Sequence, residues 1–305
     1  MISLTLITAL LIDRIIGEPK RWHPLVGFGN LATCLERYFN TKPSSHFSII
    51  IGGICFLALV SPFVVLCFFI TKNMAYSYVV SIFILYWAIG HQSLREHINI
   101  VKNHLINNDV EQAQQSLSMI VSRQTEGLDQ TQIVQATIET GLENGSDAIF
   151  APIFWFCLFG IPGVVTYRLC NTLDAMWGYR NEQFNYFGRC AARCDDVLNF
   201  IPARLVALSY ALLGNTKSAM YCLRTQSKTL KSPNAGPVMT AGAGSLHIKL
   251  GGPAYYHGKL MQKPIFGSGS LAKTKDIDRS LTLIFNTLAL WCLAIIAIEL
   301  VIHYI

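Results

Sequence analysis

Charged and amide side chains gather between residues 171 and 204, with long apolar segments on both sides of this stretch. Only 14% of the 305 residues are charged, against about 25% in a typical soluble domain. Charge beside helices of hydrocarbon length is costly unless the groups pair with each other or with a ligand. We therefore interpret this stretch as the centre of a candidate active site at a membrane surface. Its polar members include Asn171, Asp174, Arg180, Asn181, Glu182, Arg189, Arg193, Asp195, Asp196, Asn199 and Arg204.

Three of these residues share one face of a predicted helix. Arg189, Arg193 and Asp196 stand at positions i, i+4 and i+7. Guanidinium groups beside carboxylates suit a site for phosphate and a metal ion, because arginine binds the anion with two hydrogen bonds while aspartate holds the ion. A structural ion-pair network at a helix end explains the same pattern equally well.

An acidic stripe lies further upstream. Glu139, Glu143 and Asp147 stand at i, i+4 and i+8, so a helix would align the three carboxylates on one side. Like charges at this spacing repel one another unless a cation lies between them, and Mg²⁺ prefers such oxygen ligands. A solvated acidic face is the commoner explanation for a charged stripe, but the apolar segment that begins at residue 149 places this one close to a membrane.

Smaller polar groups occur elsewhere. Asp13 and Arg14 follow the first apolar segment, and an Asp–Arg pair at a helix end is more often structural than catalytic. Arg168 precedes Asn171 and Asp174 at the end of an apolar helix, where snorkelling and capping account for the same residues.

Several chemistries are not indicated. His91, His97 and His104 flank Glu96 without the spacing of a metal pair. The nine cysteines show no paired framework, which argues against structural zinc. The formal net charge is +6, but the basic residues do not alternate with aromatic ones, so no nucleic-acid partner is predicted. Lys and Arg collect in the cytoplasmic loops of membrane proteins.

The 52% hydrophobic content predicts an all-α, polytopic membrane helical bundle with cytoplasmic helical loops. Residues 91–148 read as soluble helices, with Asp109 and Asp129 as N-caps. We find no repeat or linker and predict one domain, 1–305. The expected membrane segments are about 2–12, 47–71, 74–90, 149–171, 198–213 and 281–302.

The Gly-Ile-Pro-Gly cluster at residues 160–163 interrupts one of these segments and predicts a re-entrant hairpin. The loop 215–279 is rich in Lys and Arg, which places it in the cytoplasm. If the interrupted segment turns back, the acidic stripe and the stretch 171–204 both face the cytoplasm. Two full crossings would instead turn part of that stretch outward.

Five motifs in this order resemble the CobD/CbiB family: DRIIGEPKRWHPL, ETGLENGSDAIFAPIFW, NTLDAMWGYRNEQF, AARCDDVLNFIPARL and SPNAG. The resemblance runs from Asp13 to about Gly258. Two departures are the PVM that follows SPNAG, where many relatives have a Trp, and Thr140-Gly141, which replaces a commoner Ser-Leu. Neither departure removes a charged group.

The resemblance implies an integral-membrane adenosylcobinamide-phosphate synthase of cobalamin biosynthesis. Such an enzyme joins adenosylcobyric acid to (R)-1-aminopropan-2-yl phosphate, or to ethanolamine phosphate, by an amide bond. ATP as co-substrate and Mg²⁺ are expected, and the corrinoid is a substrate, not a bound cofactor. The expected location is the cytoplasmic (inner) membrane, multi-pass, with the active site on the cytoplasmic side. The expected partners are these small molecules, the lipid bilayer and other cobalamin-assembly membrane enzymes.

On this basis the residues receive expected roles. Glu143, Asp147, Asp195 and Asp196 are catalytic candidates, and with Glu139 they form the expected Mg²⁺ ligand set. Arg180, Arg193 and Arg204 are expected to bind phosphates, and Asp174, Asn181, Asn199 and Asn234 to orient substrate. The other expected substrate-binding residues are Asp13, Arg14, His23, Arg123, Asn144, Asn171 and Glu182.

Two rival classes remain. Proteins of the AmpE group share the scaffold as non-enzymatic membrane sensors, but a sensor has no reason to keep both an acidic stripe and an Arg–Asp cluster. A transporter would carry charges within its spans, and the segments 47–71 and 281–302 carry almost none.

Overall fold

The computed structural model describes residues 2–19, 23–41, 45–72, 74–256 and 259–304. The chain divides into two compact units, each assembled from two separate parts of the sequence. Unit 1 comprises Met1–Gly90 and Ala151–Asn199, and unit 2 comprises His91–Phe150 and Phe200–Ile305. The prediction of one domain stays a prediction.

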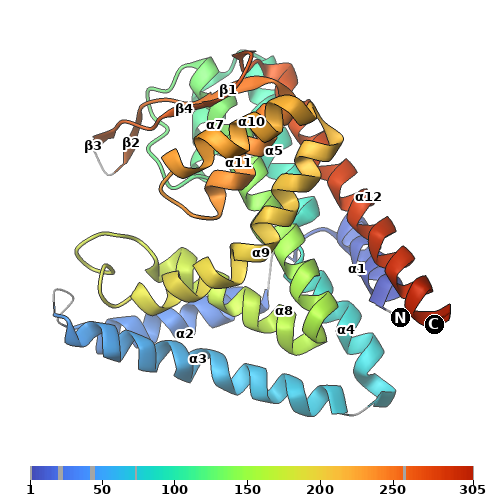
Figure 1. The fold of residues 1–305 in the computed structure, drawn as a ribbon. Coiled ribbons are helices and arrows are strands. Elements are labelled where there is room, and N and C mark those ends of the chain that lie inside the picture. Colours follow the sequence, from blue (N-terminus) through green and yellow to red (C-terminus); the bar gives the residue numbers. More distant parts are fainter. Residues whose placement is uncertain (1, 20–22, 42–44, 73, 257–258, 305) are drawn as a thin grey trace. The chain divides into compact units, whose positions relative to one another are not determined.

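The regular secondary structure of unit 1 is entirely helical in its described residues, and Figure 1 shows α2 and α3 running side by side. Helices α3 and α4 both pack against α8, and α1 packs against α4. The buried core between α2, α3, α8 and the start of α9 includes Phe28, Phe56, Leu173, Trp177 and Phe187. The helices of this unit are α1 (Ile2–Ile16), α2 (Pro24–Phe39), α3 (Phe47–Lys72), α4 (Met74–Ala88), α8 (Ala151–Trp177) and the first part of α9 (Arg189–Leu213).

Helix α8 reverses direction at the place where the sequence predicts a turn. Gly160 has φ 61° and ψ −142°, which is not helical and is a conformation that only glycine adopts readily. A Cβ atom at Gly163 would overlap the Trp155 carbonyl group, although eight residues of straight helix would separate the two by about 12 Å. The segment after Gly160 therefore folds back onto the segment before it (Figure 1).

Unit 2 contains the helices that the sequence assigns to the soluble region. Asp109 and Asp129 cap two of them as predicted, and Asp129 forms a reciprocal capping box with Gln132. In Figure 1, α10 and α11 lie side by side, in agreement with their close packing. The helices are α5 (His91–Ile106), α6 (Val110–Ser118), α7 (Gln130–Gly145), the π-helix η1 (Ser146–Phe150), the rest of α9, α10 (Thr216–Gln226), the 3₁₀ helix η2 (Ser227–Thr229), α11 (Ala235–Leu246) and α12 (Thr274–Tyr304).

Five short strands between residues 248 and 271 are an addition that the sequence analysis did not predict. The first sheet has the order β4-β1-β5, with β4 antiparallel and β5 parallel to β1, and it packs on α11. An antiparallel pair, β2 and β3, forms the second sheet. The strands are β1 (Ile248–Gly251), β2 (Ala254–Tyr256), β3 (Lys259–Met261), β4 (Ile265–Gly267) and β5 (Ser270–Leu271).

Four helical stretches in the described residues are long and apolar enough to cross a membrane: Phe47–Lys72, Gln130–Trp177, Arg189–Leu213 and Thr274–Tyr304. They indicate membrane association and confirm the predicted all-α membrane fold. Helices α1 and α4 have 15 residues each, less than the roughly 20 residues that a crossing needs.

Candidate active site

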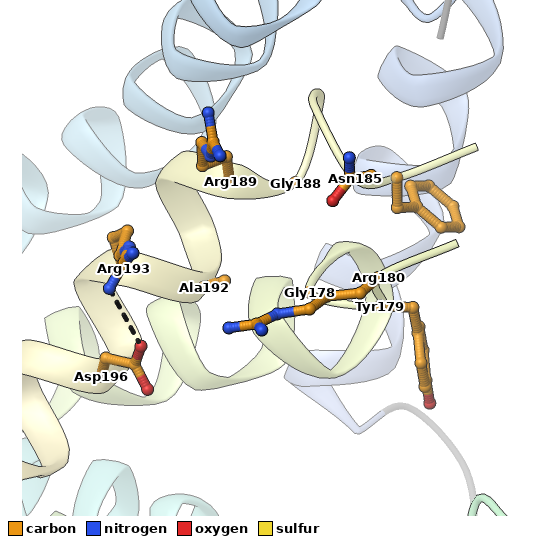
Figure 2. A pocket seen from close by; sticks show the side chains of 10 residues that line it. Gly178, Tyr179, Arg180, Asn185, Gly188, Arg189, Ala192, Arg193 and Asp196 are labelled. Carbon is orange, nitrogen blue, oxygen red and sulfur yellow. Dashed lines mark ion pairs between the residues drawn. The ribbon is translucent and has the colours of Figure 1, made fainter. Parts of the chain in front are cut away.

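A cavity of about 200 Å³ lies in unit 1, between the 178–188 loop and the first turns of α9. It is lined by three arginines and one aspartate, together with small and aromatic residues. Figure 2 shows these side chains. The complete lining is Gly178, Tyr179, Arg180, Phe184, Asn185, Gly188, Arg189, Ala192, Arg193 and Asp196.

The loop is held in place by close packing at its two ends. A Cβ atom at Gly188 would overlap the Trp177 carbonyl, and a Cβ atom at Gly52 would overlap the Phe187 carbonyl. The rings of Trp177 and Phe187 meet edge to face, with centroids 5.0 Å apart. Because both glycines let backbone approach backbone directly, the loop returns tightly to α9 and forms one side of the cavity.

The arginines come from both sides of the cavity. Arg189, Arg193 and Asp196 lie on one face of α9, as their spacing predicts, and all three line the cavity. Arg180 comes from the loop and extends toward Ala192 of α9 (Figure 2). Arg193 Nη1 lies 4.0 Å from Asp196 Oδ2, and the side chain of Arg193 is 74% exposed. The result is a basic cavity with a single carboxylate.

Asp195 points away from this cavity into a buried polar network between α8 and α9. Its Oδ1 accepts a hydrogen bond from Asn171 Nδ2 at 3.1 Å, and its Oδ2 accepts one from Asn199 Nδ2 at 3.0 Å. Asn199 Oδ1 accepts from the Tyr167 hydroxyl at 3.0 Å, and Arg168 Nη1 donates to Asn171 Oδ1 at 3.3 Å. Both oxygens of Asp195 are thus bonded to protein amides, which favours a positioning role for this residue.

Asp174 lies between the network and the cavity. Its carboxylate packs against the backbone of Gly178, which lines the cavity. It is also close enough to Asp195 and Asp196 for electrostatic repulsion between the carboxylates. His23, at the start of α2, accepts a hydrogen bond from the Leu25 amide through Nδ1 and so caps the helix.

Other predicted residues in unit 1 have local structural contacts. Asp13 on α1 is 2% exposed, whereas Arg14 is exposed. Asn181 Oδ1 accepts a hydrogen bond from the Phe184 amide at 2.9 Å and so shapes the loop. Glu182 is exposed on the same loop.

In unit 2, Glu139 is 1% exposed and surrounded by donors. Its Oε2 accepts hydrogen bonds from Arg123 Nη2 at 2.5 Å and from Lys263 Nζ at 3.3 Å, and its Oε1 accepts one from the Gly251 amide at 2.8 Å. Arg123, predicted to bind substrate, therefore binds Glu139. This arrangement favours a structural role for both residues.

The other members of the acidic stripe are less enclosed. Glu143 is half-buried and lies within electrostatic range of Lys263 and Glu139. Asp147 is half-buried in the π-helix, a type of distortion that is frequent at functional sites. Asn144 Nδ2 donates a hydrogen bond to Thr140 Oγ1 at 3.0 Å.

Arg204 and Asn234 meet in unit 2. Arg204 Nη1 donates to Asn234 Oδ1 at 3.0 Å and to the Phe200 carbonyl at 2.7 Å, and its guanidinium stacks 3.4 Å from the centre of the Phe200 ring. Nη2 donates to the Pro233 carbonyl at 3.2 Å. The structure thus brings together two residues that the sequence places far apart.

The structure gathers Asn171, Asp195 and Asn199 into one network, and Arg180, Arg193 and Asp196 into one cavity. Glu139, Glu143 and Asp147 share the α7–η1 helix in the other unit, and the predicted meeting of the two charged groups stays a prediction. Arg189 lies on the α9 face that its spacing predicts, but the sequence indicated no role for it. Tyr179 and Asn185 also line the cavity but were not predicted, because loop residues follow no regular spacing.

The carboxylates differ in how well they fit a metal ion. Among the described residues, no three His, Cys, Asp or Glu side chains are placed to hold one ion together. Mg²⁺ usually binds one or two carboxylates together with phosphates and water. Asp195 and Glu139 accept hydrogen bonds on both oxygens, which fits them less well to such an ion. The other predicted Mg²⁺ ligands are Glu143, Asp147 and Asp196.

The chain resembles known proteins over almost its whole length. The family model described as CobD/Cbib protein matches residues 6–284. The "Cobalamin biosynthesis protein CobD" of Stutzerimonas stutzeri strain A1501 is 46% identical over 299 residues, which cover 97% of each chain. The protein of the same name from Chromobacterium violaceum is 46% identical over 293 residues, 95% of this chain and 94% of that one.

The "Probable cobalamin biosynthesis protein CobD" of Methanococcus maripaludis strain C7 is 37% identical over 295 residues, 91% of this chain and 95% of that one. No solved structure matches the chain. The family model and these relatives agree, and they confirm the resemblance that the motifs predict. The chain therefore belongs to the CobD/CbiB family.

Proposed function

We propose that this chain is an adenosylcobinamide-phosphate synthase. It joins a propionate carboxyl of adenosylcobyric acid to the amine of (R)-1-aminopropan-2-yl phosphate, or of ethanolamine phosphate, with ATP and Mg²⁺. The family and the names of its curated relatives support a cobalamin-biosynthetic enzyme. The observation that carries the specific reaction is the cavity of unit 1, where three arginines and Asp196 line one small space.

The reaction needs two kinds of help. A carboxylate and an alkylammonium do not condense readily in neutral water, so the carboxylate first attacks the terminal phosphorus of ATP and releases ADP. The ammonium group loses one proton to give the free amine, which attacks the acyl phosphate; phosphate leaves, and the nitrogen loses a second proton as the amide forms. The chain has to neutralise phosphate charge and accept a proton, and fixed guanidinium groups and a carboxylate are suited to these tasks.

The cavity residues divide these tasks. Arg180, Arg189 and Arg193 bind phosphate oxygens, and Asp196 holds the amine and takes its proton. Glu143 and Asp147 of unit 2 are the residues that would hold a Mg²⁺ ion, which would neutralise phosphate charge when bound. The network around Asp195 fixes the α8 and α9 backbones behind the cavity.

We place the enzyme in the cytoplasmic (inner) membrane as a multi-pass protein with its cavity on the cytoplasmic side. The basic loop 215–279 supports this orientation. Labelling of Cys190 and Cys194 near the cavity from each side of sealed vesicles tests it: labelling from the periplasmic side alone would contradict the placement.

Purified protein in detergent tests the activity. Adenosylcobyric acid, the aminoalcohol phosphate, ATP and Mg²⁺ should yield adenosylcobinamide phosphate and ADP in equal amounts, measured by mass spectrometry. Arg193→Gln should reduce the rate, whereas Arg37→Gln, an exposed arginine on α2, should not. Amide formation without ATP, or none with it, would rule out the proposal. In a deletion strain, cobinamide should rescue growth and cobyric acid should not.

A further inference from the structure

The cavity of unit 1 combines three guanidinium groups with one carboxylate. This combination suits a ligand that carries both a phosphate and a positive charge, and not only a phosphate. We infer that the cavity binds the aminoalkyl phosphate and not the nucleotide, with the phosphate on Arg180, Arg189 and Arg193 and the ammonium on Asp196. The inference rests on the proposed function and assigns one of its substrates to a site.

The size of the cavity favours a small ligand. Its volume is about 200 Å³, whereas sites for drug-sized ligands usually span about 300–1,000 Å³. A nucleoside triphosphate belongs to the larger class because it carries a base, a sugar and three phosphates. An aminoalkyl phosphate has a two-carbon link between phosphate and amine and fits the smaller volume.

The charges of the cavity match those of an aminoalkyl phosphate. A phosphate monoester carries about −1.5 to −2 charge at neutral pH, and arginine binds it with two parallel hydrogen bonds. Among the described residues, neither the Arg180 nor the Arg189 side chain forms a hydrogen bond or ion pair. Both guanidinium groups can therefore bind phosphate without breaking a protein contact.

Asp196 accounts for the amine. A site for phosphate alone gains nothing from a carboxylate beside its arginines, because that charge repels the anion. Asp196 forms an ion pair with Arg193, with Nη1 and Oδ2 4.0 Å apart. The side chain of Asp196 is 31% exposed, so an ammonium group of the ligand can reach it.

Binding to the purified full chain, without ATP or corrinoid, tests the inference separately from catalysis. Calorimetry compares ethanolamine phosphate with ethyl phosphate, which lacks the amine. We expect ethanolamine phosphate to bind about tenfold more tightly, the equivalent of one charge-assisted hydrogen bond. Asp196→Asn should remove this preference, and Arg189→Gln should weaken both ligands. The exposed Arg37→Gln variant should leave both affinities unchanged.

Competition identifies the occupant. ATP should not displace ethanolamine phosphate, and Mg²⁺ should not be required for binding. Equal affinity for the two phosphates, displacement by ATP or an absolute need for Mg²⁺ would each overturn the inference. Thermal unfolding of each variant checks that it is still folded. Arg193→Lys is a second, conservative variant, because the side chain of Arg193 is 74% exposed; it should keep part of the affinity.

The two proposals fail in different ways. Tight binding of ethanolamine phosphate by a chain that makes no amide would refute the proposed function and keep the assigned site. Amide synthesis in which Arg189→Gln and Arg193→Gln raise the KM for ATP, but not for the aminoalcohol phosphate, would refute the site and keep the function.

Discussion

Glu139→Gln is the substitution that best separates a structural role from a catalytic one. The sequence predicts a Mg²⁺ ligand at this position, whereas the structure shows a carboxylate that is 1% exposed and bonded to Arg123, Lys263 and the Gly251 amide. Glutamine keeps the shape and one carbonyl oxygen but removes the charge. The substitution therefore leaves the positive charges of Arg123 and Lys263 close together, without the carboxylate that neutralises them.

The expected magnitude follows from burial. Removing one partner of a buried ion pair costs about 3–5 kcal/mol. The side chain of Arg123 is 11% exposed and that of Lys263 is 25% exposed, so water reaches the second cation and reduces the penalty. We expect a loss of about 3 kcal/mol in the free energy of unfolding of unit 2, roughly a hundredfold shift of the equilibrium.

Pulse proteolysis of the full chain in urea and detergent measures this free energy, from the fraction of unit 2 that resists cleavage at each urea concentration. Glu126→Gln serves as the control, because Glu126 is exposed in the same unit and should change stability by less than about 0.5 kcal/mol. Replacing Lys263 by Met in the Glu139→Gln background should recover part of the loss. A Glu139→Gln variant as stable as the control but without synthase activity would refute the structural role.

Three further predictions concern unit 1 and one buried thiol. Gly188→Ala should destabilise unit 1 by about 1–3 kcal/mol, because its Cβ atom would overlap a backbone carbonyl. Gly27→Ala, whose Cβ atom would enter open space, should cost nothing. Thermal unfolding of both variants measures the difference. Burial lowers the pKa of His23 below 6.5. The folded state therefore favours the neutral ring, and stability should be complete above pH 6.5 and fall as the pH drops below it. A His23→Asn variant, which keeps a capping side chain but does not titrate, should flatten this dependence between pH 8 and pH 5.5, and an unchanged slope would contradict it. Burial raises the pKa of the Cys222 thiol, so N-ethylmaleimide at pH 7.5 should modify the exposed Cys34 well before Cys222, as mass spectrometry of the peptides would show.

The sequence predicts best those elements that local chemistry controls. The apolar run 47–71 forms α3, Phe47–Lys72. The run is long enough to cross a bilayer, and a helix satisfies the hydrogen bonds of its backbone there. Asp129 caps its helix because its side chain bonds an amide three residues away. Gly160 turns the chain because only glycine takes its φ of 61° easily. Each of these features depends on residues that are close in the sequence.

The strands and the cavity could not be predicted in the same way. Strands β1 to β5 have two to four residues each, too few for an alternating pattern to stand out. The cavity depends on the loop 178–188, whose path follows from the contacts of Gly188 and Gly52 with distant carbonyl groups. A glycine in the sequence does not reveal which backbone it approaches.

The acidic stripe shows a third kind of difference between sequence and structure. Its spacing predicts equivalent carboxylates, but Glu139 is enclosed by Arg123, Lys263 and Gly251, whereas Glu143 and Asp147 are half-buried. Lys263 and Gly251 are more than a hundred residues away from Glu139 in the chain. Periodicity therefore identifies the face of the helix, and only the tertiary partners distinguish a structural carboxylate from one that can bind a ligand.

The consecutive aspartates of α9 show how this distinction supports the proposed chemistry. Neighbouring residues of a helix point about 100° apart, so Asp195 and Asp196 cannot serve one site in the same way. Asp195 joins α8 to α9 through Asn171 and Asn199, while Asp196 lines the arginine cavity. Because the network joins α8 to α9, it fixes the helix backbone from which Asp196 and Arg193 extend. The structure thus favours a positioning role for Asp195, and the proposed contact with the amine falls to Asp196.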